Sequence, residues 1–142
     1  MLLLGRKTYA IMQQFWPTPM ATQMSPAVAA YMNATPKLVV SHNAFAPEWA
    51  NTTVIHTDVV EQLRRYKTEA AEDIIILGSN TLCVTLLPAG LIDEVQLVLN
   101  PVVLGGGTPL FAGLSQATEL TLQETHRFQS GKLLLVYGTT VG

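Results

Sequence analysis

The 142-residue chain lacks the features that would tie it to a metal, a disulfide framework or a membrane. It has one cysteine, Cys83, which excludes an internal disulfide and favours a reducing compartment. The three histidines, His42, His56 and His126, are scattered, so no metal site is expected. No apolar run approaches the roughly 20 residues of a membrane span, and the opening Met-Leu-Leu-Leu is too short for a signal-peptide core. We expect a soluble, cytoplasmic protein.

Charged residues are also scarce, at 13% of the chain against roughly 25% in a typical globular domain. The net charge is −2, and the basic trio Arg64, Arg65 and Lys67 is best explained as a solvated helix face, so nucleic acid is not an expected partner. The low charge favours extra surface buried in an oligomer, although a compact α/β core would also lower it. We expect a single domain over residues 1–142 that forms a homodimer.

Three motifs of common enzyme classes are missing as well. The chain has no Gly-x-Ser-x-Gly of serine hydrolases, no Gly-x-x-x-x-Gly-Lys of nucleotide triphosphatases and no Gly-x-Gly-x-x-Gly of dinucleotide-binding folds. Gly105 to Gly107 precede Pro109, which has no N–H to offer, so a turned loop is a better interpretation than a phosphate loop. Cys83 lies between Leu82 and Val84, which favours a packed thiol over a nucleophile.

What the chain does contain is a strand, a small polar turn and a helix in the segment 73–87. Ile74 to Leu77 is apolar and mostly β-branched, which predicts a short strand buried on both faces of a sheet. Gly78 permits a sharp turn, and Ser79 or Asn80 can cap the helix that follows. Such a junction directs backbone N–H groups and the positive end of a helix dipole at one point, which suits a phosphate.

The chain opens in the same way. Met1 to Leu4 is an apolar run, Gly5 is the turn, and Arg6 to Thr8 lead into a helix that should end near Phe15. Here the turn carries two cations. One chain therefore offers two glycine turns, each of which opens a helix after a buried strand.

A third apolar run, Leu38 to Val40, ends in Ser41, His42 and Asn43. If the three strands are parallel, their polar ends meet at the edge where open α/β sheets bind ligands. Two helix N-termini and a cation match a diphosphate-bearing cofactor. Ordinary turns between a strand and a helix also use Gly and Ser, and on that alternative Gly78 is merely a turn and no dinucleotide binds.

The remaining elements favour an α/β domain, because strands and helices alternate as far as Leu87 and strands dominate afterwards. Asp58 is expected to cap a helix, with Glu61 completing a capping box. The other expected elements are a helix over Ala27 to Met32, a strand over Thr52 to Ile55, a strand over Val95 to Val103 interrupted by Pro101, and a hairpin of Glu119 to Thr125 with Lys132 to Tyr137.

Five segments of the chain together resemble a known family. They are Leu2 to Tyr9, Leu38 to Ser41, Ile76 to Leu82, Gly90 to Glu94 and Asn100 to Phe111. In this order they are similar to the dihydrofolate reductase-like family, in the branch of the C-terminal reductase domain of the bifunctional deaminase-reductase of riboflavin biosynthesis. The resemblance covers nearly the whole chain. It implies a three-layer α/β/α fold with a mostly parallel mixed sheet that ends in an antiparallel C-terminal hairpin.

The resemblance also implies NADPH as cofactor. Its nicotinamide would give a hydride to a pterin-like substrate or to one resembling 5-amino-6-(5-phosphoribosylamino)uracil. The two turns would hold the pyrophosphate, and Arg6 with Ser41 and His42 would surround the adenosine 2′-phosphate. The implied cofactor-binding residues are Gly5, Arg6, Lys7, Thr8, Ser41, His42, Gly78, Ser79, Asn80, Thr81 and Leu82. No carboxylate is placed well enough to be nominated as catalytic.

Two departures from the family pattern stand out. Family members often have arginine where this chain has His42, and a neutral imidazole is a weaker phosphate partner than a guanidinium. An exposed loop histidine with no role is an equal alternative. Family members also begin with a strand and a substrate-side loop ahead of the segment that starts here at Met1. Either the two halves of the sheet close together, or another chain fills the gap, or the chain is a fragment of a longer protein, and we expect N-terminal truncation. The rival function is therefore a catalytically inactive nucleotide-binding or structural oligomer that retains the fold.

Overall fold

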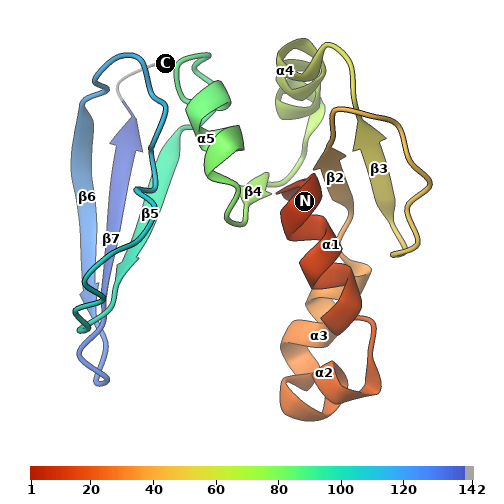
Figure 1. The fold of residues 1–142 in the computed structure, drawn as a ribbon, viewed down its shortest axis with the longest axis horizontal. Helices are drawn as coiled ribbons and strands as arrows, with labels where there is room; N and C mark the ends of the chain where they lie inside the picture. The colour runs from red at the N-terminus through yellow and green to blue at the C-terminus, as the bar shows by residue number, and fades with distance from the viewer. Residues whose placement is uncertain (140–142) are drawn as a thin grey trace. The chain divides into compact units, whose positions relative to one another are not determined.

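The structure is a computed structural model that describes residues 1–139. The chain divides into two compact units, Met1–Ser79 and Asn80–Gly142. The first unit contains a parallel sheet with the strand order β3-β2-β1-β4. Its strands β2, β3 and β4 are labelled in Figure 1. The strands are β1 (Leu2–Gly5), β2 (Lys37–Val40), β3 (Thr52–Ile55) and β4 (Ile75–Ile76).

The register of this sheet brings distant parts of the chain together. Leu3 of β1 lies opposite Leu38 of β2 on one side and Ile76 of β4 on the other. Because all four strands are parallel, their carboxyl ends share one edge of the sheet. The predicted convergence of three polar strand ends is confirmed.

Four helices accompany the parallel sheet. They are α1 (Arg6–Phe15), α2 (Pro19–Met24), α3 (Pro26–Ala34) and α4 (Val59–Glu69). Helix α1 has the predicted limits, whereas α2 is not among the elements expected from the sequence. Thr18 explains α2, because its hydroxyl oxygen accepts a hydrogen bond from the Ala21 N–H at 3.3 Å and Pro19 occupies the first turn.

The core of the first unit forms where β1 and β2 pack against α1 and α3. Its buried residues are Leu2, Leu4, Tyr9, Met32, Val39 and Trp49, and the half-buried Met12, Trp16, Phe45 and Leu77 pack against them. Alternate residues of β1 and the inner faces of two helices thus share one apolar cluster.

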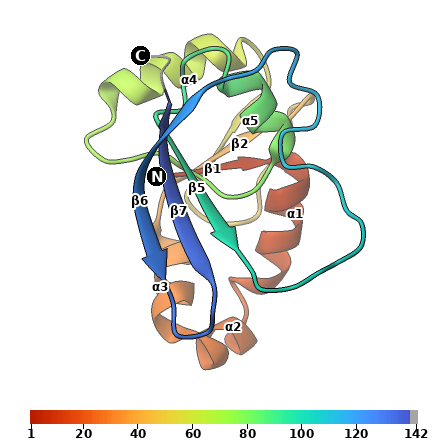
Figure 2. The same ribbon diagram turned by 90° about the vertical axis from the view of Figure 1, so that its left-hand side faces the viewer.

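The second unit contains helix α5 (Asn80–Leu86) and an antiparallel sheet with the order β5-β7-β6. Figure 2 shows its strands β5 (Glu94–Leu99), β6 (Leu120–Arg127) and β7 (Leu133–Thr139), with β7 between the other two. Strands β6 and β7 form the predicted hairpin, with a register shift between Leu122 and Glu124. The α/β class is confirmed, and the described strands form two sheets.

Three local expectations are wrong. The strand expected over Ile74 to Leu77 is reduced to the two residues of β4, at an edge of the parallel sheet, and Ile75 is 42% exposed rather than buried on both faces. The strand expected over Val95 to Val103 ends at Leu99, because Pro101 cannot donate to a ladder. Asp58 makes no side-chain cap, and its backbone is left-handed (φ 45°) rather than in the extended conformation that is typical of a capping residue.

None of the helices within residues 1–139 is both long and apolar enough to cross a membrane.

Candidate functional site

The two glycine turns of the first unit meet at Ser79. The Gly5 N–H donates to the Ser79 hydroxyl at 2.9 Å, and the Thr8 and Ser79 hydroxyl oxygens are also 2.9 Å apart. These three residues, which we call the Gly5–Ser79 junction, join the start of α1 to the turn that follows β4. The pairing of β4 with β1 makes this contact possible between segments more than 70 residues apart.

The close approach of Ser79 to the start of α1 requires a glycine at position 5. A Cβ atom built on Gly5 would lie 2.6 Å from Ser79 Oγ and 3.2 Å from Ser79 Cβ, which is too close for a side chain. Gly78 and Ser79 both have a left-handed backbone, with φ values of 67° and 62°. Left-handed backbone is unusual for serine, and it is sustained here by the hydrogen bonds of the Ser79 hydroxyl.

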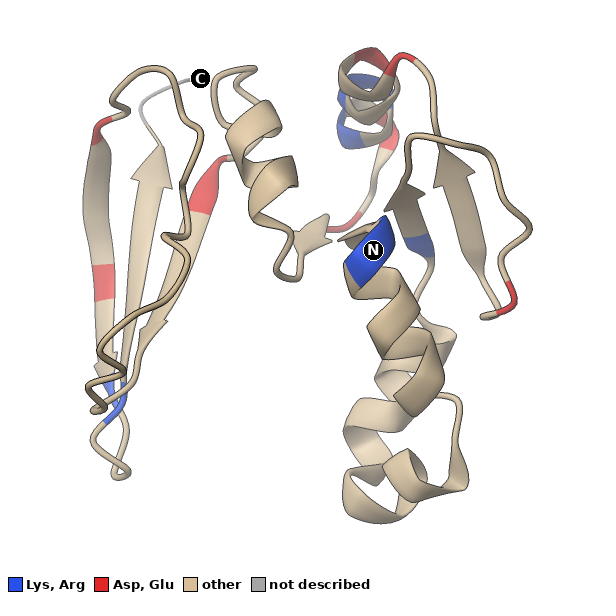
Figure 3. Cartoon of the chain, in the orientation of Figure 1, with Lys and Arg blue, Asp and Glu red and all other residues tan. Residues whose placement is uncertain are grey.

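The N-terminus of α1 carries positive charge that nothing in its first turn offsets. Gly5 is the N-cap and has no side chain to cap the helix, and the first turn contains no acidic residue. Arg6 and Lys7 are exposed there and give the blue first turn of α1 in Figure 3. Cations at a helix N-terminus oppose the helix dipole, so this end of α1 is suited to an anion.

Arg6 is held by aromatic rings. Its guanidinium carbon lies 3.7 Å from the centroid of the Phe45 ring and 5.6 Å from that of Tyr9. Phe45 belongs to the connection between β2 and β3, so this connection lies against the start of α1.

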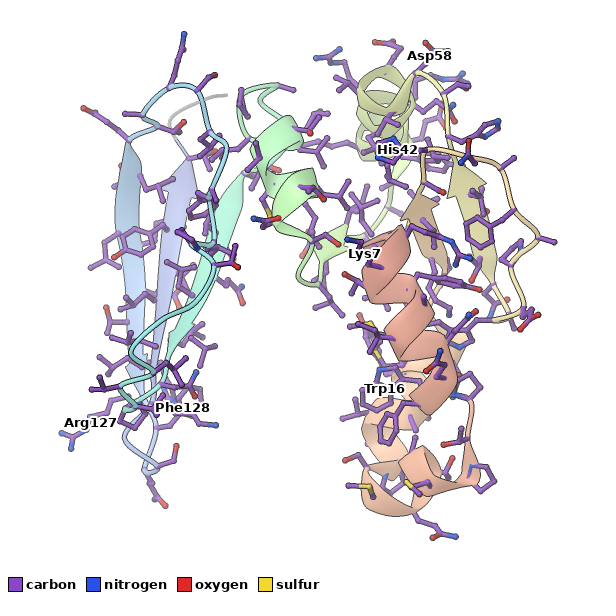
Figure 4. The ribbon with its side chains drawn as sticks, viewed as in Figure 1. Lys7, Trp16, His42, Asp58, Arg127 and Phe128 are labelled. Atoms are coloured by element: carbon purple, nitrogen blue, oxygen red, sulfur yellow. The ribbon has the colours of Figure 1, made fainter. Side chains whose placement is uncertain are left out.

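Ser41 and His42 follow β2 at the same sheet edge. Val40 of β2 lies opposite Gly5 of β1, so Ser41 is one residue beyond the level of the junction. The Ser41 N–H donates to the Ile55 carbonyl at 3.0 Å, which extends the pairing with β3, and His42 is exposed. Figure 4 shows Lys7 at the beginning of α1 and His42 in the connection after β2.

The structure thus brings together, at one edge of the first unit, most of the residues predicted for the cofactor site. They are Gly5, Arg6, Lys7, Thr8, Ser41, His42, Gly78 and Ser79. Asn80, Thr81 and Leu82 form the first turn of α5 and belong to the second unit. Leu82 is 6% exposed, so its side chain is part of a packed interior.

Phe45 and Tyr9 are the residues of this region that the sequence analysis missed. An aromatic residue in a loop has many ordinary uses, and only its contact with Arg6 distinguishes Phe45. A pocket of about 330 Å³ in the second unit was also not predicted. Leu87, Phe111, Leu114, Leu120 and the polar segment 115–118 line it.

Metal and thiol chemistry have little support in the part of the chain that the structure describes. Within residues 1–139, no cluster of histidine, cysteine, aspartate or glutamate side chains could hold a metal ion. Burial raises the pKa of the Cys83 thiol, which disfavours the thiolate that a nucleophile needs. Cys83 is therefore better explained as a packing residue.

Comparison with known proteins gives consistent results. A family model described as the RibD C-terminal domain matches residues 1–134. The uncharacterized protein YyaP of Bacillus subtilis (strain 168) is 30% identical over 137 residues, which are 96% of this chain and 72% of that protein.

Solved structures share the fold. A putative riboflavin biosynthesis protein from Shewanella sp. PV-4 matches with a TM-score of 0.75 at 19% identity, over 98% of this chain and 73% of that one. A pyrimidine reductase-like protein from Corynebacterium diphtheriae matches with a TM-score of 0.64 at 14% identity, over 97% of this chain and 75% of that one.

Proposed function

Because the chain belongs to the RibD C-terminal domain family, we propose that it is an NADPH-dependent reductase that transfers a hydride to a small heterocycle. The substrate class would be a pyrimidine such as a 5-amino-6-(5-phosphoribosylamino)uracil-like compound, or a pterin. The observation that carries the proposal is the Gly5–Ser79 junction at the cationic end of α1.

The residues at the junction fit a dinucleotide. Gly5 leaves the space that a side chain would fill, Thr8 and Ser79 offer hydroxyl groups, and the helix end offers N–H groups to a diphosphate. Arg6, Ser41 and His42 would hold the 2′-phosphate of the adenosine ribose, with Lys7 adding positive charge. Gly78 shapes the turn that presents the Ser79 hydroxyl to Gly5.

The bound cofactor would supply the hydride, so this chain's task is to bind and orient the two reactants and to exclude water. The junction would hold the diphosphate that links the two nucleoside halves of the cofactor. We also propose that residues 1–142 act as one reductase domain and pair as a homodimer, which the 13% charged fraction supports.

Titration with NADPH tests the proposed function. Trp16 and Trp49 both lie in the first unit, and we expect their emission to change saturably as NADPH binds. We further expect NADPH to be oxidised when an aminouracil or pterin substrate is added. Binding without oxidation by any such substrate would favour the inactive nucleotide-binding alternative, and no binding at all would refute the proposal.

A matched pair of threonine variants shows whether the junction is the binding site. Thr8→Val removes a junction hydroxyl and should weaken NADPH about three- to tenfold, the usual worth of one hydrogen bond. Thr68→Val is the control, because the Thr68 hydroxyl donates to the Arg64 carbonyl within α4. Equal affinities of the two variants would place the cofactor elsewhere.

A His42 variant tests the place of this residue in the site. His42→Ala removes a proposed partner of the 2′-phosphate and should weaken the binding of NADPH about three- to tenfold, the usual worth of one hydrogen bond. NADH lacks the 2′-phosphate, so its affinity should change by less than about twofold. Equal affinities of wild type and His42→Ala for NADPH would remove His42 from the site.

A further inference from the structure

The contact between Arg6 and Phe45 ties a loop to the cationic end of α1. The Phe45 ring is half-buried, and its centroid lies 3.7 Å from the Arg6 guanidinium carbon. The ring also contacts Tyr9, with ring centroids 5.6 Å apart and ring planes at 54°. Phe45 therefore contacts both a core residue and an exposed cation.

Buried groups fix the position of the Phe45 ring. Tyr9 is fully buried, and its hydroxyl oxygen accepts a hydrogen bond from the backbone N–H of Trp49 at 3.1 Å. Trp49 is itself 4% exposed, and its ring centroid lies 6.1 Å from that of Tyr9. The loop that carries Phe45 is thus attached to α1 through two buried aromatic residues.

The geometry of the stack leaves Arg6 able to bind an anion. A guanidinium that lies against a ring uses its flat face, so the N–H donors at its edge stay available for a phosphate. Within residues 1–139, the structure gives these donors no carboxylate or carbonyl partner. The ring also restrains a long side chain that would otherwise be ordered only when a ligand binds.

We infer that Phe45 is a positioning residue of the proposed cofactor site, which holds Arg6 for the 2′-phosphate and so favours NADPH over NADH. This inference rests on the proposed function. It adds that discrimination between the two dinucleotides depends on an aromatic residue in the connection between β2 and β3, which itself need not touch the cofactor.

Dissociation constants of NADPH and NADH for two Phe45 variants test the inference. Phe45→Leu keeps apolar bulk but removes the ring face. It should weaken the binding of NADPH about three- to tenfold and change the affinity for NADH less than about twofold. Phe45→Tyr keeps the ring and should bind NADPH within about twofold of wild type. When Phe45→Leu is added to Arg6→Gln, it should lower the affinity for NADPH by less than about twofold more, because its effect acts through Arg6.

Three outcomes would overturn the inference. Equal weakening of NADPH and NADH by Phe45→Leu would make Phe45 a general structural support, and unchanged affinities would remove it from the site. A full effect of Phe45→Leu in the Arg6→Gln background would show that it does not act through Arg6. A wild-type chain that binds neither dinucleotide would refute the proposed function itself, and thermal unfolding of each variant identifies any loss of fold.

Discussion

Replacing Lys37 with methionine is expected to lower the free energy of unfolding of the first unit by about 2–4 kcal/mol. Lys37 is 1% exposed, and its Nζ donates to the carbonyls of Met32, Asn33 and Thr35 at 2.9, 3.4 and 2.7 Å. These carbonyls lie at the C-terminal end of α3, where the helix has no donors of its own. Methionine fills a similar volume but leaves all three carbonyls without this donor.

The chemistry of the site matches an ammonium group. Three N–H donors meet three carbonyl oxygens, and the negative end of the α3 dipole favours a cation. The Nζ also lies 4.5 Å from the Trp49 ring, which gives the cation a fourth favourable contact. Lys37 is thus a buried cap for α3, and its loss exposes the helix end to an apolar interior.

Urea unfolding followed by tryptophan emission measures this effect, because Trp16 and Trp49 both belong to the first unit. Lys67→Met is the control. It changes an exposed lysine on α4 in the same unit and should alter the free energy of unfolding by less than about 1 kcal/mol. If Lys37→Met matched this control, other groups would have to satisfy the α3 carbonyls.

The difference in unfolding free energy between wild type and Lys37→Met should also depend on pH, and its direction follows from the pKa of Lys37. Burial lowers the pKa of Lys37 below its ordinary value of 10.5. The unfolded chain then holds this proton more tightly than the folded chain, so the contribution of Lys37 to stability grows as the pH rises towards 10.5 and declines as the pH falls through the lowered value. The difference in unfolding free energy between wild type and Lys37→Met should therefore increase with pH in this range.

Much of the first unit could be predicted from local sequence. An apolar run, a glycine turn and a proline mark the limits of strand β1 and helix α1 in the sequence. Strand β3 has the limits that were expected for it. Helix α2 was missed because prolines surround a polar stretch, and its cap depends on one hydroxyl of Thr18. The capping box at Asp58 failed because a left-handed backbone at that residue cannot be seen in the sequence.

For the site, the sequence could predict only that the ends of parallel strands lie at the same edge of the sheet. The hydrogen bond between Gly5 and Ser79 depends on the register of β1 against β4, which pairs residues more than 70 positions apart. Local patterns carry no information about such a register. Lys37 is a similar case, because a lysine at the start of a strand is ordinarily exposed and only the end of α3 gives it buried partners.

Gly5→Ala is expected to weaken NADPH at least about tenfold and to destabilise the first unit by about 1–3 kcal/mol. The new Cβ would lie 2.6 Å from Ser79 Oγ, and the Ser79 hydroxyl could move away only by breaking its hydrogen bonds with Gly5 and Thr8. Gly106→Ala is the matched control, because apart from residues 105–107 no atom lies within 4 Å of the position of its added Cβ. It should leave both quantities nearly unchanged.

A double variant separates crowding from loss of the hydroxyl. Ser79→Gly removes the atom that Gly5→Ala would meet, and glycine accepts the left-handed backbone of residue 79 without strain. Unfolding free energies should therefore be non-additive, with Gly5→Ala costing less in the Ser79→Gly background than alone. NADPH affinity should stay low in the double variant, since the Ser79 hydroxyl is missing. Additive stabilities would mean that Gly5 and Ser79 do not meet, and the proposed cofactor site would lose the contact on which it depends.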